Sequence, residues 1–543
     1  MLEAAYILSI LLMIFIPLGL AFWLRRRFPT PWLLFGLGAL TFAVAQAVHI
    51  PLNNWLADVG LLPGESASDL PLWQTALTLG LTAALCEELA RAAGYLALYK
   101  LKPAWLRLQD GIMLGLGHGG FEAMVFGGIL TAATVGALMP LLATDLASLG
   151  LSGEQLTALE AQLSLLEGTV LVAFVPLLER LLAISAQVVL SLLVWRAFAS
   201  RRLGRDWFYI LLAIAYHAAI DYVAVWIGQT YPPGRPLPGL LALAAVLIPG
   251  WVWAAWSVRS NRPARSAPSP LRGEWQLFWI AMLKELRQAW RTKRVLSVWA
   301  VFLIFGMISP LLAKFTPEIL GSLEGAEMFA ELIPKPTAFD AMSQYIKNIT
   351  QFGFLLAVLL GMGAVVGEKE RGVAAMILSK PMARGTFITS KFSAQGLIYL
   401  AGFILAGIGA YYYTLVLFGA PEFTSFILLN LLLWLWLMPF VGLSLLGSTL
   451  GKSTVAAGGI GVLLSVALML VGSLPQITPL LPGGLVGWAT QAGQQSSGVQ
   501  LAAEAANPLS GALAVPGGTA AAAVVVVVMA LVLAVGIFEQ QEL

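Results

Sequence analysis

Apolar runs of about 20 residues recur along almost the whole chain, and they predict membrane-spanning helices. A helix rises about 1.5 Å per residue, so about 20 apolar residues cross the hydrocarbon core of a bilayer. Seven runs lie in the first half, near 5–24, 31–50, 72–99, 110–138, 169–196, 207–228 and 239–258. Six follow, near 295–314, 351–367, 393–418, 425–449, 455–474 and 517–538. We predict an all-α polytopic membrane protein of about 13 transmembrane helices in two helical-bundle domains, 7 + 6.

Composition and loop charge add an orientation to this prediction. Of the 543 residues, 59% are hydrophobic and 11% are charged, which excludes an ordinary soluble domain. Basic residues such as Lys100 and Arg201 gather in alternate loops, and acidic residues such as Asp58 and Glu160 gather in the others. Lys and Arg concentrate in cytoplasmic loops. We therefore predict a multi-pass protein of the cell (plasma) membrane, with its N-terminus outside and its C-terminus in the cytoplasm.

A change in composition divides the chain in two. Residues 259–274 are rich in Arg, Pro and Ser and predict a cytoplasmic linker between a domain at 1–258 and a domain at 275–543. Aromatic and basic residues then alternate up to residue 294, which indicates a helix lying in the membrane interface against lipid. Its position beside a span argues against nucleic acid as a partner. Residues 315–350 and 475–516 are predicted to be long outside segments.

Six ionisable residues fall inside predicted spans, where a charge is costly and marks a functional site. They are Glu87, Glu88, Arg91, His118, His217 and Asp221. Counted along each helix from the charged residue at its nearer end, Glu88, His118 and His217 lie roughly 16 to 18 Å into their spans. The three residues are therefore at a similar depth. Arg91 follows Glu88 by three residues, so the two share a helix face. The alternative is that these groups only neutralise one another between helices.

Two further polar residues, Glu122 and His49, qualify this picture. Glu122 follows His118 by four residues, as Asp221 follows His217, so each pair shares a helix face. His49 lies near the outer end of its span without an acid four residues away. We predict it to be an interfacial histidine.

Four short motifs carry a resemblance to a known family. CEELAR (86–91), GLGHGGFEA (115–123), LLER (177–180) and YHAAID (216–221) resemble the YhfC branch of the CAAX-protease and bacteriocin-processing superfamily of intramembrane peptidases. The resemblance covers about residues 1–258. It implies a water-activating glutamate at Glu87 or Glu88, with His118 and His217 polarising the water or the scissile carbonyl. Asp221 would stand in the position that follows the last histidine, and the predicted supporting residues are Arg91, Glu122, Glu179, Arg180 and Gln187.

Gln187 departs from the pattern of that family. A histidine is expected one to two turns after Glu179 and Arg180, and this chain has Gln187 in the layer of the site. A glutamine can donate or accept a hydrogen bond but cannot take a proton as histidine can. The substitution is compatible with altered chemistry or with an inactive enzyme.

The chemistry of these residues allows two mechanisms. A carboxylate can act as general base on a water while histidines stabilise the oxyanion. Alternatively, Glu88, His118, His217 and Asp221 can bind a zinc-type ion that activates the water. The chain lacks the H-E-x-x-H spacing of the strongest zinc signature, which favours the metal-free mechanism. We predict no cofactor in this chain, with zinc as the alternative.

The second half resembles a transporter family. KELRQAWRTKR (284–294) and GEKERGVAAMILSKPMARGTFITSKF (367–392) are similar to segments of permease subunits of ABC exporters of the second type. The family pattern is matched by Glu368, Gly372, Pro381, Arg384 and Lys391. The resemblance implies that this segment couples to an ABC ATPase subunit, and that a second permease copy or paralogue completes a dimer. The alternative is a plain basic cytoplasmic loop.

The chain itself lacks a recognisable nucleotide site. GSTLGKST (447–454) is close to a phosphate-binding loop, but Leu446 stands where the motif needs its first glycine. ATP is therefore expected on a partner subunit. Three functions compete: a permease fused to an intramembrane peptidase, a permease with an inactive peptidase-like module, and a peptidase whose permease-like half presents substrate. We predict the fusion.

Overall fold

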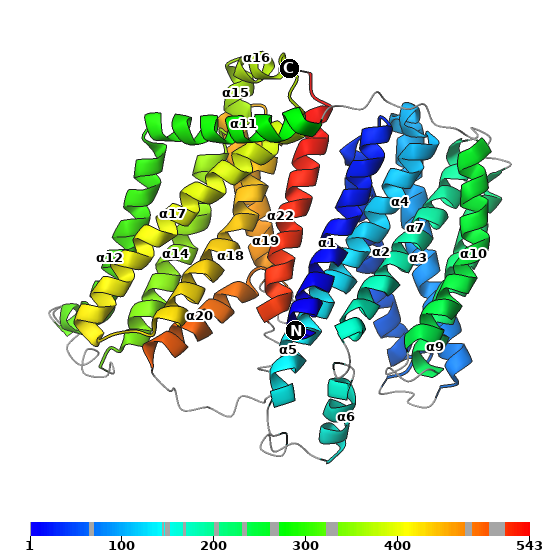
Figure 1. Cartoon of the computed structure of the whole chain (residues 1–543), viewed down its shortest axis with the longest axis horizontal. Coiled ribbons are helices and arrows are strands. Elements are labelled where there is room, and N and C mark those ends of the chain that lie inside the picture. Colours follow the sequence, from blue (N-terminus) through cyan, green and yellow to red (C-terminus); the bar gives the residue numbers. More distant parts are fainter. Residues whose placement is uncertain are drawn as a thin grey trace. The chain divides into compact units, whose positions relative to one another are not determined.

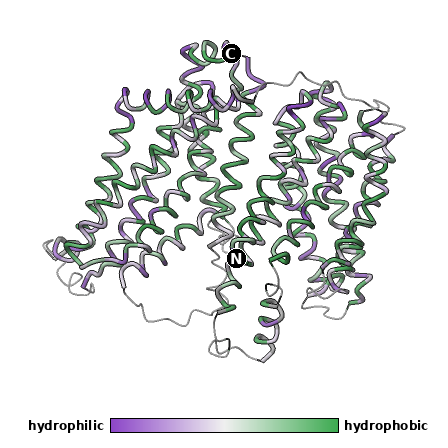
Figure 2. Tube along the Cα trace, viewed as in Figure 1, coloured by the Kyte–Doolittle hydropathy of each residue, from purple (hydrophilic) through white to green (hydrophobic). Residues whose placement is uncertain are grey.

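The computed structural model describes residues 2–64, 70–143, 146, 153–164, 166, 170–199, 206–230, 236–260, 271–321, 335–472, 481–498 and 516–542. The chain divides into two compact units, residues 1–269 and 270–543, and each is described by itself. The elements of the described residues are helices (Figure 1). Figure 2 shows hydrophobic residues along the long helices and hydrophilic residues mostly toward their ends. This distribution is that of a polytopic membrane protein.

Unit 1 is a helical bundle. Its long helices are α1 (Leu2–Arg27), α2 (Trp32–Asp58), α3 (Leu72–Leu101), α4 (Leu108–Glu122), α7 (Val175–Ala199), α9 (Phe208–Thr230) and α10 (Pro236–Ser260). After α4 the chain continues through a π-helix, η2 (Ala123–Leu130), into α5 (Thr131–Leu138). Shorter elements are η1 (Pro103–Trp105), η3 (Met139–Ala143), α6 (Gly153–Ser164) and η5 (Val170–Phe174). Helix α3 packs between α2 and α9, and α4 packs against α2 and α7.

Glycines bring the central helices of unit 1 into backbone contact. A Cβ on Gly117 would lie 2.1 Å from the carbonyl oxygen of Phe35, and one on Gly38 would lie 2.1 Å from that of Leu114. A Cβ on Gly119 would lie 2.7 Å from Cβ of Gln187. Small residues at such positions let membrane helices approach closely. The glycines around His118 therefore hold that residue between α2 and α7.

Unit 2 has its own bundle and a helix across one end of it. The elements are α11 (Leu271–Arg291), α12 (Arg294–Gly321), α14 (Ala338–Gly361), α15 (Val366–Glu370), α16 (Val373–Leu378), α17 (Arg384–Phe418), α18 (Phe423–Leu450), α19 (Thr454–Gly472), α20 (Gly484–Ser497) and α22 (Pro516–Glu539). Within this unit, α11 crosses the ends of the long helices, and α15 and α16 lie at the same end (Figure 1). Helix α18 packs against α19, α20 and α22, and α12 packs against α17.

Twelve helices of the described residues are long and apolar enough to cross a membrane, six in each unit. Helix α3, which has 30 residues, is not among them. It carries Glu87, Glu88 and Arg91 in its middle, which lowers its hydropathy. The predicted count of 13 spans, arranged 7 + 6, requires α3 as a seventh span of unit 1, so it stays a prediction.

Two predicted outside segments contain helices. Helix α12 continues to Gly321, α14 begins at Ala338 rather than near 351, and α20 lies within 475–516. The first turns of α14 carry polar residues, so hydropathy placed its start too late. The helix begins at a capping box in which Asp340 accepts from the backbone and side chain of Thr337, both at 2.7 Å. Helix α20 is rich in Gly, Gln and Ser and gives no span signal.

Candidate functional site

The adjacent residues Glu87 and Glu88 of α3 have different partners. Both carboxylate oxygens of Glu88 accept from Nη1 of Arg91, at 2.6 and 2.7 Å, and Oε1 also accepts from Nδ1 of His217 at 2.8 Å. Glu88 and Arg91 have 0% exposed area, so this is a fully buried ion pair. Glu87 instead lines a cavity of about 280 Å³. Glu88 therefore holds α3 and α9 together, and Glu87 faces the space where chemistry can occur.

Three donors hold the Glu87 carboxylate. Its Oε2 accepts from Nε2 of His118 at 3.1 Å and from Nε2 of Gln187 at 3.0 Å. Its Oε1 accepts from Nε2 of Gln46 at 3.1 Å. An ionised carboxylate only accepts, so His118 donates from Nε2. Its Nδ1 lies 2.9 Å from the hydroxyl oxygen of Thr41, which donates to the carbonyl oxygen of Gly38 at 2.7 Å. Four helices, α2, α3, α4 and α7, thus fix one carboxylate.

His217 and Asp221 of α9 complete the wall of the cavity. Nδ1 of His217 is held by Glu88, and Nε2 lies 3.8 Å from Oε2 of Glu87 and 3.5 Å from Oδ2 of Asp221. Carboxylates face both ring nitrogens, so both nitrogens can donate. The cavity has room for several waters.

Gln187 is a central member of this network. Its Oε1 accepts from Nη2 of Arg91, and its Nε2 donates to Glu87 and, at 2.9 Å, to Oε2 of Glu122. Glu122 also accepts from Nη1 of Arg180 at 3.1 Å. One amide thus supplies an acceptor and two donor bonds. Gln187, which stands where the family pattern has a histidine, therefore positions Glu87 and Glu122.

A second cavity adjoins the first. It measures about 680 Å³ and is lined mostly by apolar residues of α5, α7, α9, α10 and η2, together with Glu179. The two cavities share Phe126 and Arg180. Phe126 belongs to the π-helix η2, and single π-helical turns are frequent at functional sites. Of the predicted site residues, Glu179 lines the second cavity, and Glu88, Arg91 and His118 bond to residues of the first cavity without lining it. The others line the first cavity: Glu87, Glu122, Arg180, Gln187, His217 and Asp221.

Sequence reasoning missed Thr41 and Gln46 of α2 and assigned His49 to the membrane interface rather than to the site. His49 lines the cavity, and its Nδ1 lies 3.4 Å from Oε1 of Gln46, whose amide donates to Glu87. Its Nε2 lies 2.9 Å from Nδ2 of Asn53. The description of His49 as an interfacial residue is therefore incomplete. The available signal was the spacing of Gln46, His49 and Asn53, which places three polar residues on one face of an apolar helix.

We expect His49 to orient Glu87 through Gln46. Because Gln46 donates to Glu87, its Oε1 faces His49, whose Nδ1 must carry the proton. The amide nitrogen of an asparagine at position 49 would lie where Nδ1 of His49 lies, so it could still donate to Gln46. The amide nitrogen of a glutamine would lie where Nε2 lies, so it could not. His49→Asn should therefore keep Gln46 and Glu87 oriented, and His49→Gln should release Gln46 and change the surroundings of Glu87.

The chain has three histidines, so ¹⁵N-histidine labelling gives three resolvable imidazoles. The His118 signal should move in His49→Gln and stay in place in His49→Asn. Equal spectra for the two variants would contradict this coupling.

The predicted coupling residues of unit 2 are mostly internal. Lys284, Glu285, Glu368 and Lys391, here called the Lys–Glu tetrad, form one cluster. Nζ of Lys284 donates to Glu368 at 2.6 Å and to Glu285 at 2.8 Å, and Nζ of Lys391 lies 2.7 Å from Glu285 and 3.0 Å from Glu368. Glu368 and Lys391 are each 2% exposed. Burial lowers the pKa of Lys284, but the two carboxylates outweigh it and raise that pKa above its ordinary value. The tetrad ties α11, α15 and α17 together.

Arg384 is also directed inward. Its Nη1 donates to the carbonyl oxygens of Phe538 and, at 2.7 Å, of Gln541 at the end of α22. Gly372 has φ +68° before α16, a left-handed conformation that favours glycine. Two predicted coupling residues, Gly372 and Pro381, are exposed, and so are Arg371, Met376 and Lys380. The charges of the motif therefore shape the segment from within and leave α16 on its surface.

Comparison with known proteins relates each half to a family. Residues 12–231 match the family described as YhfC intramembrane metalloprotease, and residues 279–543 match the ABC-2 family transporter protein. The uncharacterized membrane protein YhfC of Bacillus subtilis (strain 168) is 30% identical over 212 residues, 39% of this chain and 79% of that protein. The chain belongs to the YhfC family through its first half, and its second half matches the ABC-2 family model. We call residues 12–231 the YhfC domain and residues 279–543 the ABC-2 domain.

Two further relatives agree with this membership. The uncharacterized transmembrane protein YxlG of Bacillus subtilis (strain 168) is 30% identical over 195 residues, 35% of this chain and 74% of that protein. The probable ABC transporter permease protein NosY of Pseudomonas aeruginosa is 29% identical over 132 residues, 24% of this chain and 43% of that protein. No solved structure matches the chain. The protein is an ABC-2 permease domain fused to a YhfC-like intramembrane protease domain, and a permease of this type implies an ABC ATPase partner.

The family description implies a metal ion, so we tested the residues for a fit. Two imidazole Nε2 atoms and carboxylates near Glu87 are donors that zinc takes, and both rings are held at Nδ1 as in metal sites. Yet no three His, Cys, Asp or Glu side chains in the described part of the chain are arranged to hold an ion. Glu88, a member of the zinc set predicted from the sequence, is bound to Arg91 and to the far nitrogen of His217. The residues do not fit a metal centre in this arrangement.

Proposed function

We propose that the YhfC domain is an intramembrane peptidase in which Glu87 activates water. The contrast between the two adjacent glutamates is the main support, since Glu88 is fully bound by Arg91 and His217 whereas Glu87 lines the cavity. Oε1 of Glu87 accepts one hydrogen bond, from Gln46, and keeps a lone pair for water.

The side chains supply a complete hydrolytic cycle. A water bound to Glu87 attacks the scissile carbonyl carbon while Glu87 takes its proton. Nε2–H of His217 donates to the resulting oxyanion. Oδ2 of Asp221 lies 3.5 Å from that nitrogen, and the Asp221 carboxylate offsets the positive charge of the His217 ring. The C–N bond then breaks as Glu87 returns the proton to the leaving amine. The products are a carboxylate and an amine.

The second cavity supports a membrane peptide as the substrate class. It is larger than the first, mostly apolar, and shares Phe126 and Arg180 with it as lining residues. An apolar peptide segment can therefore approach the Glu87 cavity without leaving the hydrocarbon layer.

Cleavage of a labelled panel of apolar 20-residue peptides in micelles tests this function. Mass spectrometry should find two fragments whose masses sum to that of the peptide plus one water. Intact peptides throughout the panel would favour an inactive, structural YhfC domain. A zinc-dependent peptidase is the second candidate, favoured by the family description and by the outer hydrogen bonds to both histidines.

For the ABC-2 domain we propose that residues 366–383 dock on the ATPase partner through α16. Met376 is 65% exposed at the centre of this short helix, with Arg371 and Lys380 beside it. An exposed apolar residue among charges is the composition of an interface centre with a polar rim. The basic loops support a cytoplasmic position for this end and for the C-terminus, with the N-terminus outside. A dimer with a second permease copy belongs to the same proposal.

Met376→Asp should weaken ATPase binding at least tenfold, because it places a charge at the centre of the interface. Affinity is measured by co-purification and by titration of the ATPase onto the membrane protein. Lys347→Glu, which lies in α14 outside this segment, is the matched control and should bind normally. Unchanged binding of Met376→Asp would show that the ATPase contacts another surface.

A further inference from the structure

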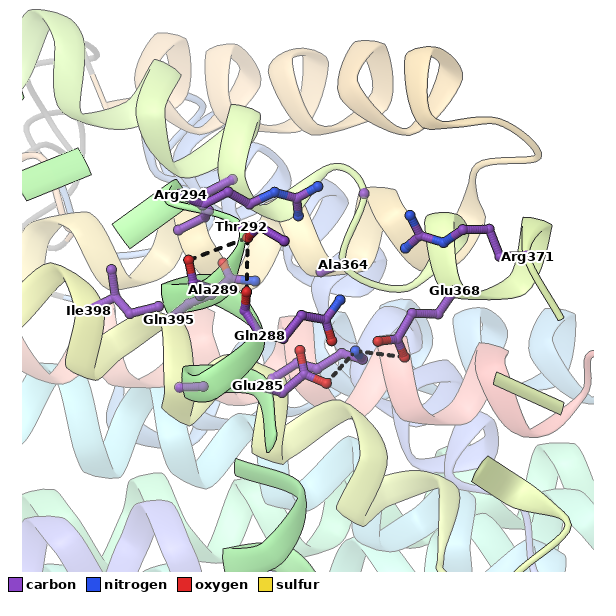
Figure 3. Close-up of a pocket in the computed structure, with 14 residues that line it drawn as sticks. Glu285, Gln288, Ala289, Thr292, Arg294, Ala364, Glu368, Arg371, Gln395 and Ile398 are labelled. Atoms are coloured by element: carbon purple, nitrogen blue, oxygen red, sulfur yellow. Dashed lines mark hydrogen bonds and ion pairs between the residues drawn. The ribbon is translucent and has the colours of Figure 1, made fainter. Parts of the chain in front are cut away.

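Two adjoining cavities lie where α11, α12 and α14 meet the docking segment. The first is polar and small, about 50 Å³, and is shown in Figure 3. The second is about 280 Å³ and lies mainly between the start of α12 and the end of α14. The two share Arg294, Leu360 and Gly363. The shared lining residues place the charged side chains of the first cavity next to the apolar wall of the second.

The polar cavity has an excess of positive charge. The four charges of the Lys–Glu tetrad offset one another within their own ion pairs. Arg294 and Arg371 lie outside these pairs, and neither makes an ion pair or side-chain hydrogen bond within the described residues. In Figure 3 their guanidinium groups point toward one another across the pocket. Both arginines are exposed, and the two acids that line the same cavity, Glu285 and Glu368, are already paired with lysines. Two such cations favour a bound anion, and guanidinium groups match phosphate geometry.

A buried acceptor lines the same cavity. Oε1 of Gln395 has no hydrogen-bond partner, although the residue is only 6% exposed. Buried polar atoms are normally satisfied. A ligand with a hydroxyl group beside its phosphate would supply the missing donor.

The apolar cavity determines which anion fits. It is lined by Val298 and Val301 of α12 and by Leu356 and Leu359 of α14, all within spans. A free phosphate has nothing to place there, whereas a phospholipid has an acyl chain. Basic pockets between spans are known binding places for anionic lipid headgroups.

We propose that this site binds an anionic phospholipid of the phosphatidylglycerol type. Its phosphate lies between Arg294 and Arg371, its headgroup hydroxyl donates to Gln395, and an acyl chain occupies the groove between α12 and α14. Arg294 begins α12 and Arg371 lies between α15 and α16, so the phosphate joins the first span of the ABC-2 domain to the docking segment. Anionic lipid therefore stabilises that segment in the position in which the ATPase meets it. This last consequence rests on the proposed docking function, but lipid binding does not.

Native mass spectrometry of the full chain from nanodiscs of phosphatidylglycerol and phosphatidylcholine tests the site. The wild-type chain should retain phosphatidylglycerol preferentially. Arg294→Gln and Arg371→Gln should each lower its retention about fivefold, and the double variant about 25-fold. The reason is that each basic residue near an anionic lipid contributes about 1 kcal/mol of attraction, which corresponds to about fivefold in affinity. Arg291→Gln, which removes an exposed arginine of α11 outside both cavities, is the matched control and should retain the lipid.

Three results would overturn the proposal. They are equal retention in the double variant and the wild-type chain, equal loss in Arg291→Gln, and displacement of the lipid by millimolar inorganic phosphate, which would indicate a site for a free anion. A melting measurement confirms that each variant is folded, and Arg294→Lys should recover part of the retention. The ATPase is absent from this experiment, so its outcome is independent of the docking proposal.

Discussion

Glu87→Gln is expected to slow peptide cleavage by about 100- to 10,000-fold, the usual contribution of a general base. The glutamine keeps the size of the side chain but cannot take a proton from water. Cleavage is measured with the labelled peptide panel in micelles. Substrate binding should change little, so the loss should appear in kcat rather than in KM.

Glu88→Gln is the matched control, because it makes the same change one residue away. It removes the charge that pairs with fully buried Arg91, so it should lower stability by about 3 to 5 kcal/mol. Its kcat, measured at a temperature at which it is folded, should fall less than that of Glu87→Gln. The reverse order would assign the base to Glu88 and contradict the mechanism.

Lys391→Met is expected to destabilise the ABC-2 domain by about 3 to 5 kcal/mol, because it leaves Glu285 and Glu368 sharing one lysine in a buried place. Thermal unfolding of the purified chain measures this effect. Lys380→Met removes an exposed lysine of the same segment and should change stability by less than about 0.5 kcal/mol.

The double variant Lys391→Met with Glu368→Gln tests the cause of that loss. It removes one charge of each sign, so its destabilisation should be smaller than the sum of the two single effects. Additive losses would show that the tetrad acts as separate contacts.

Apolar periodicity predicted the helical architecture because span length and hydropathy are properties of each segment alone. It failed where a helix leaves the apolar layer. Helix α14 begins at Ala338 with polar turns, and α20 carries no span signal, so both fell within predicted outside segments. Helix α3 shows the opposite case, since its buried charges reduce the very signal that identifies a span.

The candidate site could be predicted as a set of residues but not as a set of contacts. The cost of burying charge brought attention to Glu87, Glu88 and His118. Neighbouring residues on a helix point in different directions, so only the partners on α4, α7 and α9 separate Glu87 from Glu88. Thr41 and Gln46 are neutral and cost less to bury than a charge, so nothing in their spacing or type singled them out.

The coupling motif shows a similar limit. Charge in a cytoplasmic segment predicts a polar surface, but the sequence does not say which charges face inward. Glu368 and Lys391 are buried within the tetrad, and Arg384 bonds the end of α22. Met376 is 65% exposed on α16, which the sequence alone does not show.

The most direct test of the account is peptide cleavage by the purified wild-type chain before and after exhaustive treatment with a metal chelator. If Glu87 and its neighbours activate water by themselves, the rate should be the same after chelation, and Glu87→Gln should remain inactive with or without added zinc. Loss of cleavage on chelation, with recovery when zinc alone is added back, would contradict the glutamate mechanism and establish the metal-dependent one.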